Sequence, residues 1–265
     1  MMANKVVVSG DKITAIADAI RTKTGNSDLM SLDDMPTQIA SIKGDGEDGV
    51  LAMVEKTVTE FSNEDVTKIG DYSFYDNRVL SVLNTPNVER VGVGAFTRCT
   101  GLNAIDMPKC KIIGSQSFTS CNGVKSFNMP LLEEVPQGAL NSMTTLTEVN
   151  LSSLKVAGTQ SFYFCSSLTN VDFLQLESIG QHAFNQTKMT TLIIRTNAVC
   201  TLEHTNAFLN SPIVRGTGYV YVPKELVDSY KSATNWSAYA DQIRAIEDYP
   251  EITGDKQMVV KEFLE

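Results

Sequence analysis

The chain has 265 residues, of which 42% are hydrophobic and 20% are charged, a composition that is typical of a folded domain and excludes wholesale disorder. A net charge of -9 argues against a nucleic-acid partner, which requires a basic surface to displace counterions from phosphates. No apolar run approaches the roughly 18 residues that span a bilayer, so we expect no membrane insertion.

The first residues, MMANKVVVSGDK, contain no small-residue cleavage site, and we therefore expect no secretory signal. Five cysteines are an odd number for a chain of this length. This count argues against a disulfide framework and favours synthesis in a reducing cytosol.

Residues 1–43 are predicted to form a small helical module. Ile13, Ile16, Ala17 and Ile20 recur at helical spacing, which predicts a helix over about residues 12–23. A second helix is expected after Ser31. Two such helices are too small to bury a core alone, because roughly 40 residues is the usual lower limit, so we expect this module to attach to a partner or to oligomerise. The glycine-rich and acidic residues 44–52 are expected to be a flexible linker.

A repeat of 22 residues organises the centre of the chain. Phenylalanines recur at multiples of this spacing, with a leucine in the one empty place: Phe74, Phe96, Phe118, Leu140, Phe162 and Phe184. A period in the range of roughly 20–50 residues predicts a solenoid, in which each unit buries its apolar face against its neighbours. We assign the solenoid to residues 53–222, with a capping strand over Met53 to Phe61.

Each unit has the same internal pattern. A turn-forming residue, usually glycine, stands four residues before the phenylalanine, and we expect a tight corner with positive φ there. Apolar residues nine and eleven positions after it, such as Ile105 and Met107, predict a strand with one buried face. The fold class is therefore predicted as an α+β solenoid with one parallel sheet, a small N-terminal helical module and a C-terminal helical cap.

The repeat becomes irregular toward its end. The sixth unit is one residue short, and a seventh unit begins near Phe208, two residues later than the common period would place it. Residues 223–248 are predicted to form a helical cap whose apolar side contains Leu226, Tyr230, Trp236 and Tyr239. Residues 249–265 are expected to be an acidic tail.

Neither the cysteines nor the histidines predict catalysis. Cys99, Cys121 and Cys165 occupy one position of the repeat, where Met143 also stands, and this indicates a buried apolar site; a disulfide between stacked units is the alternative. Without a CxxC spacing, zinc is not expected. His182 and His204 have no nucleophile placed beside them, so surface or capping roles are expected. We expect no enzymatic activity and no cofactor.

One polar row is the candidate ligand-binding site. It stands ten residues after each phenylalanine, between the two buried positions of every strand, and therefore faces solvent. Ile193 continues it in the shortened unit. Two interpretations remain open: an amide ladder that stabilises the stack, or a ligand face for a protein or glycan. The row consists of Asn84, Asp106, Asn128, Asn150 and Asp172.

The segments VGVGAFTRCTGLNAIDMP, IGSQSFTSCNGVKSFNMP and IGQHAF resemble the BspA-type (Treponema pallidum-type) leucine-rich repeat. The resemblance covers about residues 54–248. It implies leucine-rich repeats, a role in adhesion or in protein and glycan binding, and no enzymatic activity. Leu140, Met143 and the short sixth unit depart from the family pattern, which affects local geometry and not the fold.

The segment ITAIADAIRTKTGNSDLMSLDDMPTQIASI resembles a segment of tail and minor structural proteins of phages that infect Gram-positive bacteria, and the resemblance covers about residues 11–43. It implies a phage or prophage virion protein that contacts other virion proteins, or a second copy of itself, through residues 11–43. The repeats would then attach to a host surface protein or glycan. A bacterial cell-surface adhesin is the alternative, and a decoration protein without a receptor is a third.

Overall fold

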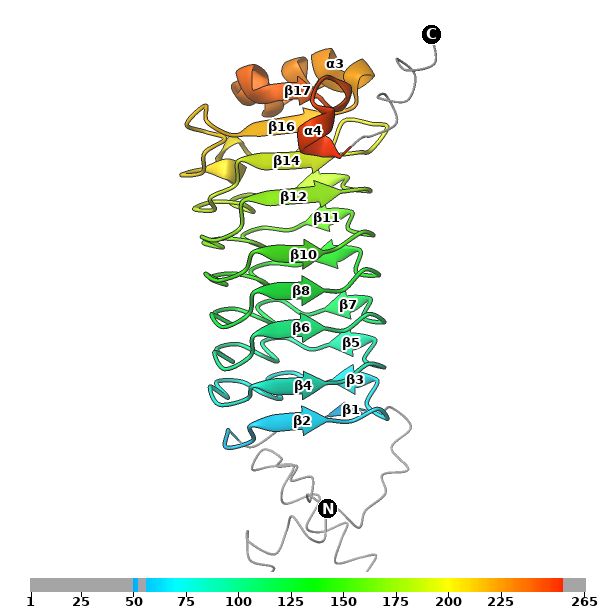
Figure 1. Cartoon of the computed structure of the whole chain (residues 1–265), viewed down its shortest axis with the longest axis vertical. Helices are drawn as coiled ribbons and strands as arrows, with labels where there is room; N and C mark the ends of the chain where they lie inside the picture. The colour runs from blue at the N-terminus through cyan, green and yellow to red at the C-terminus, as the bar shows by residue number, and fades with distance from the viewer. Residues whose placement is uncertain (1–49, 52–55, 255–265) are drawn as a thin grey trace, which may run out of the picture.

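The structure, a computed structural model, describes residues 50–51 and 56–254. The predicted helical module of residues 1–43, most of the 44–52 linker and residues 255–265 of the tail lie outside the described residues. The rest is a stack of similar turns of chain, one above another along the long axis of the molecule (Figure 1). The predicted solenoid is confirmed.

Longer strands line one side of the stack and run parallel to one another (Figure 1). Hydrogen bonding joins them in the orders β2-β4, β10-β8-β6 and β12-β14-β16-β17. They are β2 (Glu60–Ser62), β4 (Val82–Asn84), β6 (Ala104–Asp106), β8 (Ser126–Asn128), β10 (Glu148–Asn150), β12 (Asn170–Phe173), β14 (Thr191–Ile194), β16 (Tyr219–Val222) and β17 (Ile243–Ala245). We call this side the long-strand face.

A second set of parallel strands, which the sequence analysis did not predict, forms another side of the stack. These strands have two residues each, too few to show the alternation of period two by which a strand is recognised. They pair in the orders β1-β3-β5-β7 and β15-β13-β11-β9. They are β1 (Val50–Leu51), β3 (Lys68–Ile69), β5 (Arg90–Val91), β7 (Ile112–Ile113), β9 (Glu134–Val135), β11 (Val156–Ala157), β13 (Ser178–Ile179) and β15 (Thr201–Leu202).

A column of buried phenylalanine rings fills the centre of the stack. The rings of Phe74 and Phe96 stack at 4.9 Å between centroids, and those of Phe96 and Phe118 at 5.2 Å. After the interruption at Leu140, stacking resumes from Phe162. Aromatic pairs of this kind contribute about 0.5–1.5 kcal/mol beyond their area burial. The 22-residue spacing therefore places one ring of each unit directly against the next.

The corner glycines are needed for close approach between units. A Cβ on Gly114 would lie 2.4 Å from the backbone nitrogen of Val93, closer than any real contact. The prediction of positive φ at these corners was wrong. Positive φ instead falls two residues before and two residues after the phenylalanine, mostly on residues other than glycine, such as Gln116 and Ser120.

Pro136 breaks the short-strand set. In neighbouring units the corner N–H donates to a carbonyl one unit earlier, as from Gly114 to Val91 (2.8 Å) and from Gly158 to Val135 (2.9 Å). Proline has no N–H to donate and carries a Cβ where only glycine fits. Accordingly β7 and β9 are not paired, and a hollow of about 490 Å³ lies between them, with Pro136 in its lining.

Of the predicted capping strand over Met53 to Phe61, residues 53–55 lie outside the described residues, and residues 56–59 are not in a strand. Within the described residues the strand there is β2, which begins at Glu60 and pairs with β4 in the same register as later units. Phe61 is buried where Leu83 stands one unit later. The first of the described long strands therefore belongs to a partial repeat unit that continues the stack.

Short helices close the C-terminal end, as predicted. Tyr230, Trp236 and Tyr239 are buried against the last units, and Trp236 contacts the ring of Phe208. The strand β17 was not expected; it pairs with β16 and extends the long-strand face into the cap. The helices are η1 (Thr205–Phe208), η2 (Lys224–Leu226), α3 (Val227–Ser232), η3 (Trp236–Gln242), η4 (Ile246–Asp248) and α4 (Pro250–Thr253).

Candidate functional site

The predicted polar row lies on the long-strand face with its side chains outward. The middle residues of β6 and β8, Ile105 and Phe127, are buried, and those of β4 and β10, Leu83 and Val149, are half-buried, while the residues on either side are exposed or half-buried. Asp106, Asn128 and Asn150 occupy equivalent positions in one continuous sheet. Asn84 and Asp172 lie in the sheets before and after it.

Three residues of the row form a ladder of side-chain hydrogen bonds. Asn150 Nδ2 donates to Asn128 Oδ1 (2.8 Å), and Asn128 Nδ2 donates to Asp106 Oδ1 (2.6 Å). At the N-terminal end, Asn84 Nδ2 donates to Ser62 Oγ (3.1 Å). Each amide has a second N–H, and each oxygen a second lone pair, so a ladder leaves capacity for an external ligand. The two interpretations of the row are therefore compatible.

Asp172 is paired differently. It follows the Asn150 position, but it pairs with Arg195, which donates from Nε to Oδ1 (2.9 Å) and to Oδ2 (3.0 Å) and from Nη2 to Oδ2 (2.8 Å). This fork-to-fork geometry fixes both side chains. Arg195 directly follows β14 and was not singled out from the sequence. The sequence signal that could have pointed to Arg195 was its position immediately after the strand of the shortened unit.

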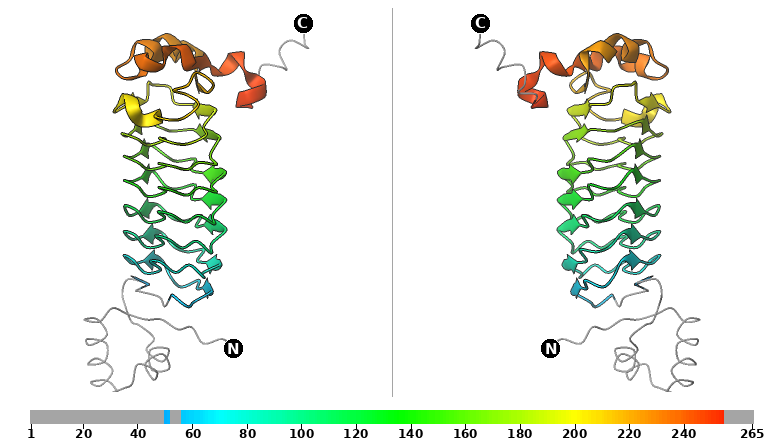
Figure 2. Two further views of the ribbon diagram at one scale, coloured as in Figure 1. Left: turned by 90° about the vertical axis from the view of Figure 1, so that its left-hand side faces the viewer. Right: turned by 90° about the vertical axis from the view of Figure 1, so that its right-hand side faces the viewer.

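Beyond Asp172 the row turns apolar. Ile193 and Tyr221 occupy the next two equivalent positions and are 5% and 3% exposed. Both pack with Ile246, and Tyr249 covers them from outside the sheet. The segment after β17 therefore folds back over the long-strand face, as Figures 1 and 2 show for α4.

A hollow of about 450 Å³ lies where the polar row meets α4. Its floor is the long-strand face, and its wall is the end of α4. Carboxylate, amide, hydroxyl and apolar groups therefore converge in one place, which is the usual composition of a binding site. The lining residues are Asn170, Val171, Asp172, Thr191, Ile193, Ile252 and Gly254.

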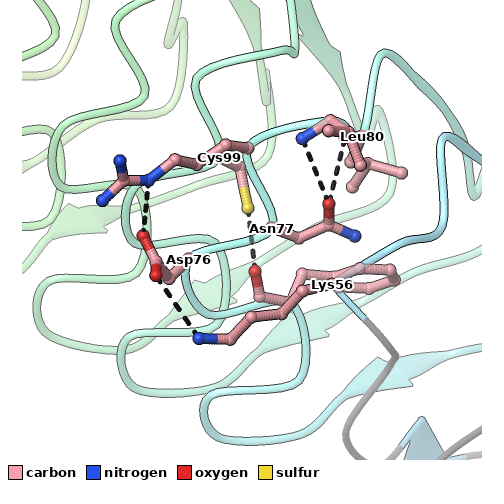
Figure 3. A network of polar contacts seen from close by, with 8 residues as sticks. Lys56, Asp76, Asn77, Leu80 and Cys99 are labelled. Atoms are coloured by element: carbon pink, nitrogen blue, oxygen red, sulfur yellow. Dashed lines mark hydrogen bonds and ion pairs between the residues drawn. The ribbon is translucent and has the colours of Figure 1, made fainter.

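A polar network ties the N-terminal partial unit to the first full repeat (Figure 3). Asp76 accepts from Arg78 Nε (2.8 Å) and from Lys56 Nζ (3.3 Å). The hydrogen bond from Arg78 is the main reason that the pKa of Asp76 is lowered, and Lys56 adds to it. Asn77 caps the unit, because its amide donates to Val58 O (3.0 Å) and accepts from Leu80 N (3.1 Å). The charged and polar groups of this network therefore pair with one another.

The cysteines are structural. All five are free and buried. The thiols of Cys99 and Cys121 donate to the carbonyls of Phe74 and Phe96 (3.0 and 2.9 Å), and Cys165 makes the same contact to Leu140. Burial raises the pKa of Cys99 and of Cys165 to about 12, which suppresses the reactive thiolate. No disulfide joins stacked units in the part of the chain that is described.

The histidines stabilise the last units. His204 Nδ1 accepts from the N–H of Asn206 and so caps η1, as expected. His182 Nδ1 lies 2.8 Å from Asn185 Nδ2, and its Nε2 lies 3.0 Å from Asn206 Nδ2. Among residues 50–51 and 56–254, no group of three or more metal-ligating side chains is present, and no helix is long and apolar enough to cross a membrane.

Comparison with solved structures finds similarity to leucine-rich repeat proteins. A leucine-rich repeat protein from Bacteroides ovatus aligns over 74% of this chain and 55% of its own, with 22% identity and a TM-score of 0.51. One from Eubacterium ventriosum aligns over 62% and 46%, with 23% identity and a TM-score of 0.47. The chain thus spans about half the length of the proteins it matches. No curated protein sequence matches it.

The family comparison covers the repeats themselves. The model of the BspA type leucine rich repeat region matches residues 55–155 and 92–214, in six copies. This span includes the long and short strands from β2 to β15 and the whole phenylalanine column. The chain therefore belongs to the BspA type leucine rich repeat family.

Proposed function

We propose that this protein is a binding protein whose long-strand face attaches to a macromolecule through the polar row and the hollow beside α4. The observation that carries the proposal is the convergence of the two: the row leads directly into the hollow, and Asp172 belongs to both. The proposal assigns no catalytic role to any residue and requires no cofactor.

The chemistry of the face suits a partner rich in hydrogen-bonding groups. The amides of Asn128 and Asn150 keep one N–H each outside the ladder, and Asp106 keeps a carboxylate oxygen outside it. The five polar residues of the row include no aromatic ring on which a sugar could stack, and Tyr221, which continues the row, is only 3% exposed. Of the two candidate partners, a surface protein and a glycan, these features favour the protein.

We propose that the setting is a phage or prophage virion, with residues 11–43 contacting other virion proteins or a second copy of the chain. The support for this setting is the sequence resemblance of residues 11–43, which lie outside the described residues. Mass spectrometry of purified virions is the direct test. Absence from particles would overturn the virion setting and leave the alternative, a bacterial cell-surface adhesin of the same repeat class.

A triple variant tests the binding face. We expect Asn128→Ala, Asn150→Ala and Asp172→Ala together to weaken binding to host cells at least about tenfold, since each removes a polar contact worth roughly 0.5–1.5 kcal/mol. The readout is binding of labelled full-length protein to cells, beside the melting temperature.

The matched control lies on the short-strand side. Glu134→Ala, Ser178→Ala and Thr201→Ala together also remove one carboxylate and two neutral polar groups from strands. Binding lost equally in both triple variants, or retained in the first, would contradict the proposed face. If the first variant lowered only the melting temperature, the row would serve the stack alone.

A further inference from the structure

A second hollow lies away from the long-strand face, on the segments that connect each phenylalanine to the following long strand. Its volume is about 470 Å³. Three successive units contribute to it, those of Phe162, Phe184 and Phe208. The lining residues are Ser166, Gln186, Thr187, Lys188, Asn210, Pro212 and Arg215.

The hollow is located where the repeat changes length. Units in the middle of the stack pair at the common period, as Asp106 does with Asn128. The step from Asn170 to its partner Thr191 is one residue shorter than this period, whereas the step from Thr191 to Tyr219 is six residues longer. The strands that these connections join remain paired, so the additional residues of the lengthened connection form a loop, and Arg215 lies in it.

Two cations without a carboxylate partner face this hollow. Lys188 and Arg215 are exposed, and neither forms an ion pair with a carboxylate of residues 56–254. The lining contains no acidic side chain. This concentration of positive charge is unexpected in a chain whose net charge is -9.

The first repeat unit shows how the same position is neutralised elsewhere. Arg78 stands four residues after Phe74, as Lys188 does after Phe184, and Asp76 two residues after Phe74 pairs with it at 2.8 Å. In the unit of Phe184 the place of Asp76 is taken by Gln186. The amide leaves the cation free for an external anion.

The neutral groups of the lining are held in place. Gln186 Nε2 donates to Tyr163 Oη (2.7 Å), and the buried Thr187 donates to Phe184 O (2.9 Å). Asn210 Nδ2 lies 3.4 Å from Asn185 Oδ1. A fixed polar rim with two cations suits a doubly charged oxyanion, because arginine supplies a planar fork of donors and lysine a compact charge.

We propose that this hollow binds a tetrahedral dianion, phosphate or sulfate, whether free or as an ester group on a polymer. Lys188 and Arg215 neutralise its charge, and the amides of Gln186 and Asn210 donate to its oxygens. The site is independent of the polar row and of the virion setting.

Titration of the full-length, ¹⁵N-labelled protein with sodium phosphate or sodium sulfate tests the proposal, with sodium chloride holding the ionic strength constant. We expect saturable shifts of the side-chain amide signals of Gln186 and Asn210 with either dianion. Titration with acetate shows whether a carboxylate can replace the dianion. Titrations with a phosphorylated and with a sulfated polysaccharide, compared with those of the free ions, show whether the bound group is an ester on a polymer and which one.

Lys188→Gln with Arg215→Gln is expected to weaken phosphate binding at least about tenfold, since both charge-assisted hydrogen-bond donors are removed. Lys109→Gln with Lys125→Gln, two exposed lysines elsewhere in the stack, is the control. Shifts that do not saturate, that occur equally with chloride or acetate, or that survive in the double variant would overturn the proposal.

Discussion

The middle of the stack, residues 90–173, and its C-terminal end, residues 174–254, are built from the same unit but differ in what they offer to a partner. In the middle, every long strand repeats at the common period, and the outward polar groups bond to one another from Asp106 to Asn150. At the C-terminal end the step between paired strands first shortens and then lengthens, and outward positions become apolar.

The difference shows that exact repetition lets the outward polar side chains form hydrogen bonds with one another. When equivalent side chains stand one strand spacing apart, about 4.8 Å, each amide can bond to the next. Where the spacing changes, side chains lose their equivalent neighbours, and hollows open beside Asp172 and beside Lys188. Pro136 makes the same point within the middle region, because a single departure there opens a hollow.

The largest expected effect is on the phenylalanine column of the middle region. Phe118→Ala removes a fully buried ring that stacks on Phe96 and contacts Phe127 edge-on at 5.1 Å. We expect the free energy of unfolding to fall by about 3–5 kcal/mol, measured by denaturant titration. Leu140→Ala, in the one place without a ring, should cost about 2–5 kcal/mol. A decrease in the free energy of unfolding below about 1 kcal/mol for Phe118→Ala would contradict the conclusion that the phenylalanine column stabilises the stack.

The corner residues provide the next comparison. Gly114→Ala places a Cβ 2.4 Å from the backbone of the preceding unit, and we expect a loss of about 2–3 kcal/mol from the strain. Pro136→Ala should change stability by less than about 1 kcal/mol, because β9 already stands apart from β7. Thermal unfolding of both variants is the measurement. Equal losses of stability in the two variants would show that the close approach of neighbouring units does not require glycine at position 114.

The outward row gives a smaller, paired prediction. Ile193→Ala removes a side chain from the apolar cluster that it forms with Tyr221 and Ile246, and it should cost about 2 kcal/mol. Asn128→Ala interrupts the ladder at the equivalent position and should cost about 1 kcal/mol, the net contribution of a hydrogen bond. Chemical denaturation distinguishes the two. A larger cost at Asn128 than at Ile193 would reverse our account of the two regions.

The smallest effect concerns pH at the N-terminal network. The pKa of Asp76 is lowered from 3.8 in the folded state, so its stabilising contribution is present above that pH and is lost as the pH falls through the folded pKa. Asp76→Asn should therefore melt slightly below the unmodified protein at pH 7, and the difference should shrink as the pH falls below 3.8. A difference that persists at acidic pH would exclude the ion pairs as its cause.

Some features of the site were predictable and others were not. The outward orientation of Asn128 and Asn150 followed from the alternation of each strand. The pairing of Asp172 with Arg195 did not, because Arg195 follows the shortened unit, whose register the repeat alone leaves undefined. The wall formed by α4 was equally unpredictable, since it depends on where the chain turns back after β17.

The sequence by itself determined the period, the buried column and the identity of the row, because a repeating chain that buries one face must place equivalent residues in equivalent environments. Only the tertiary structure decided that the row forms a hydrogen-bonded ladder in the middle of the stack and lines a hollow at its C-terminal end. The physical reason is distance: hydrogen bonds and hollows depend on how closely neighbouring units approach. That approach is set by the non-repeating residues, among them Pro136 and the irregular connections after Phe184 and Phe208.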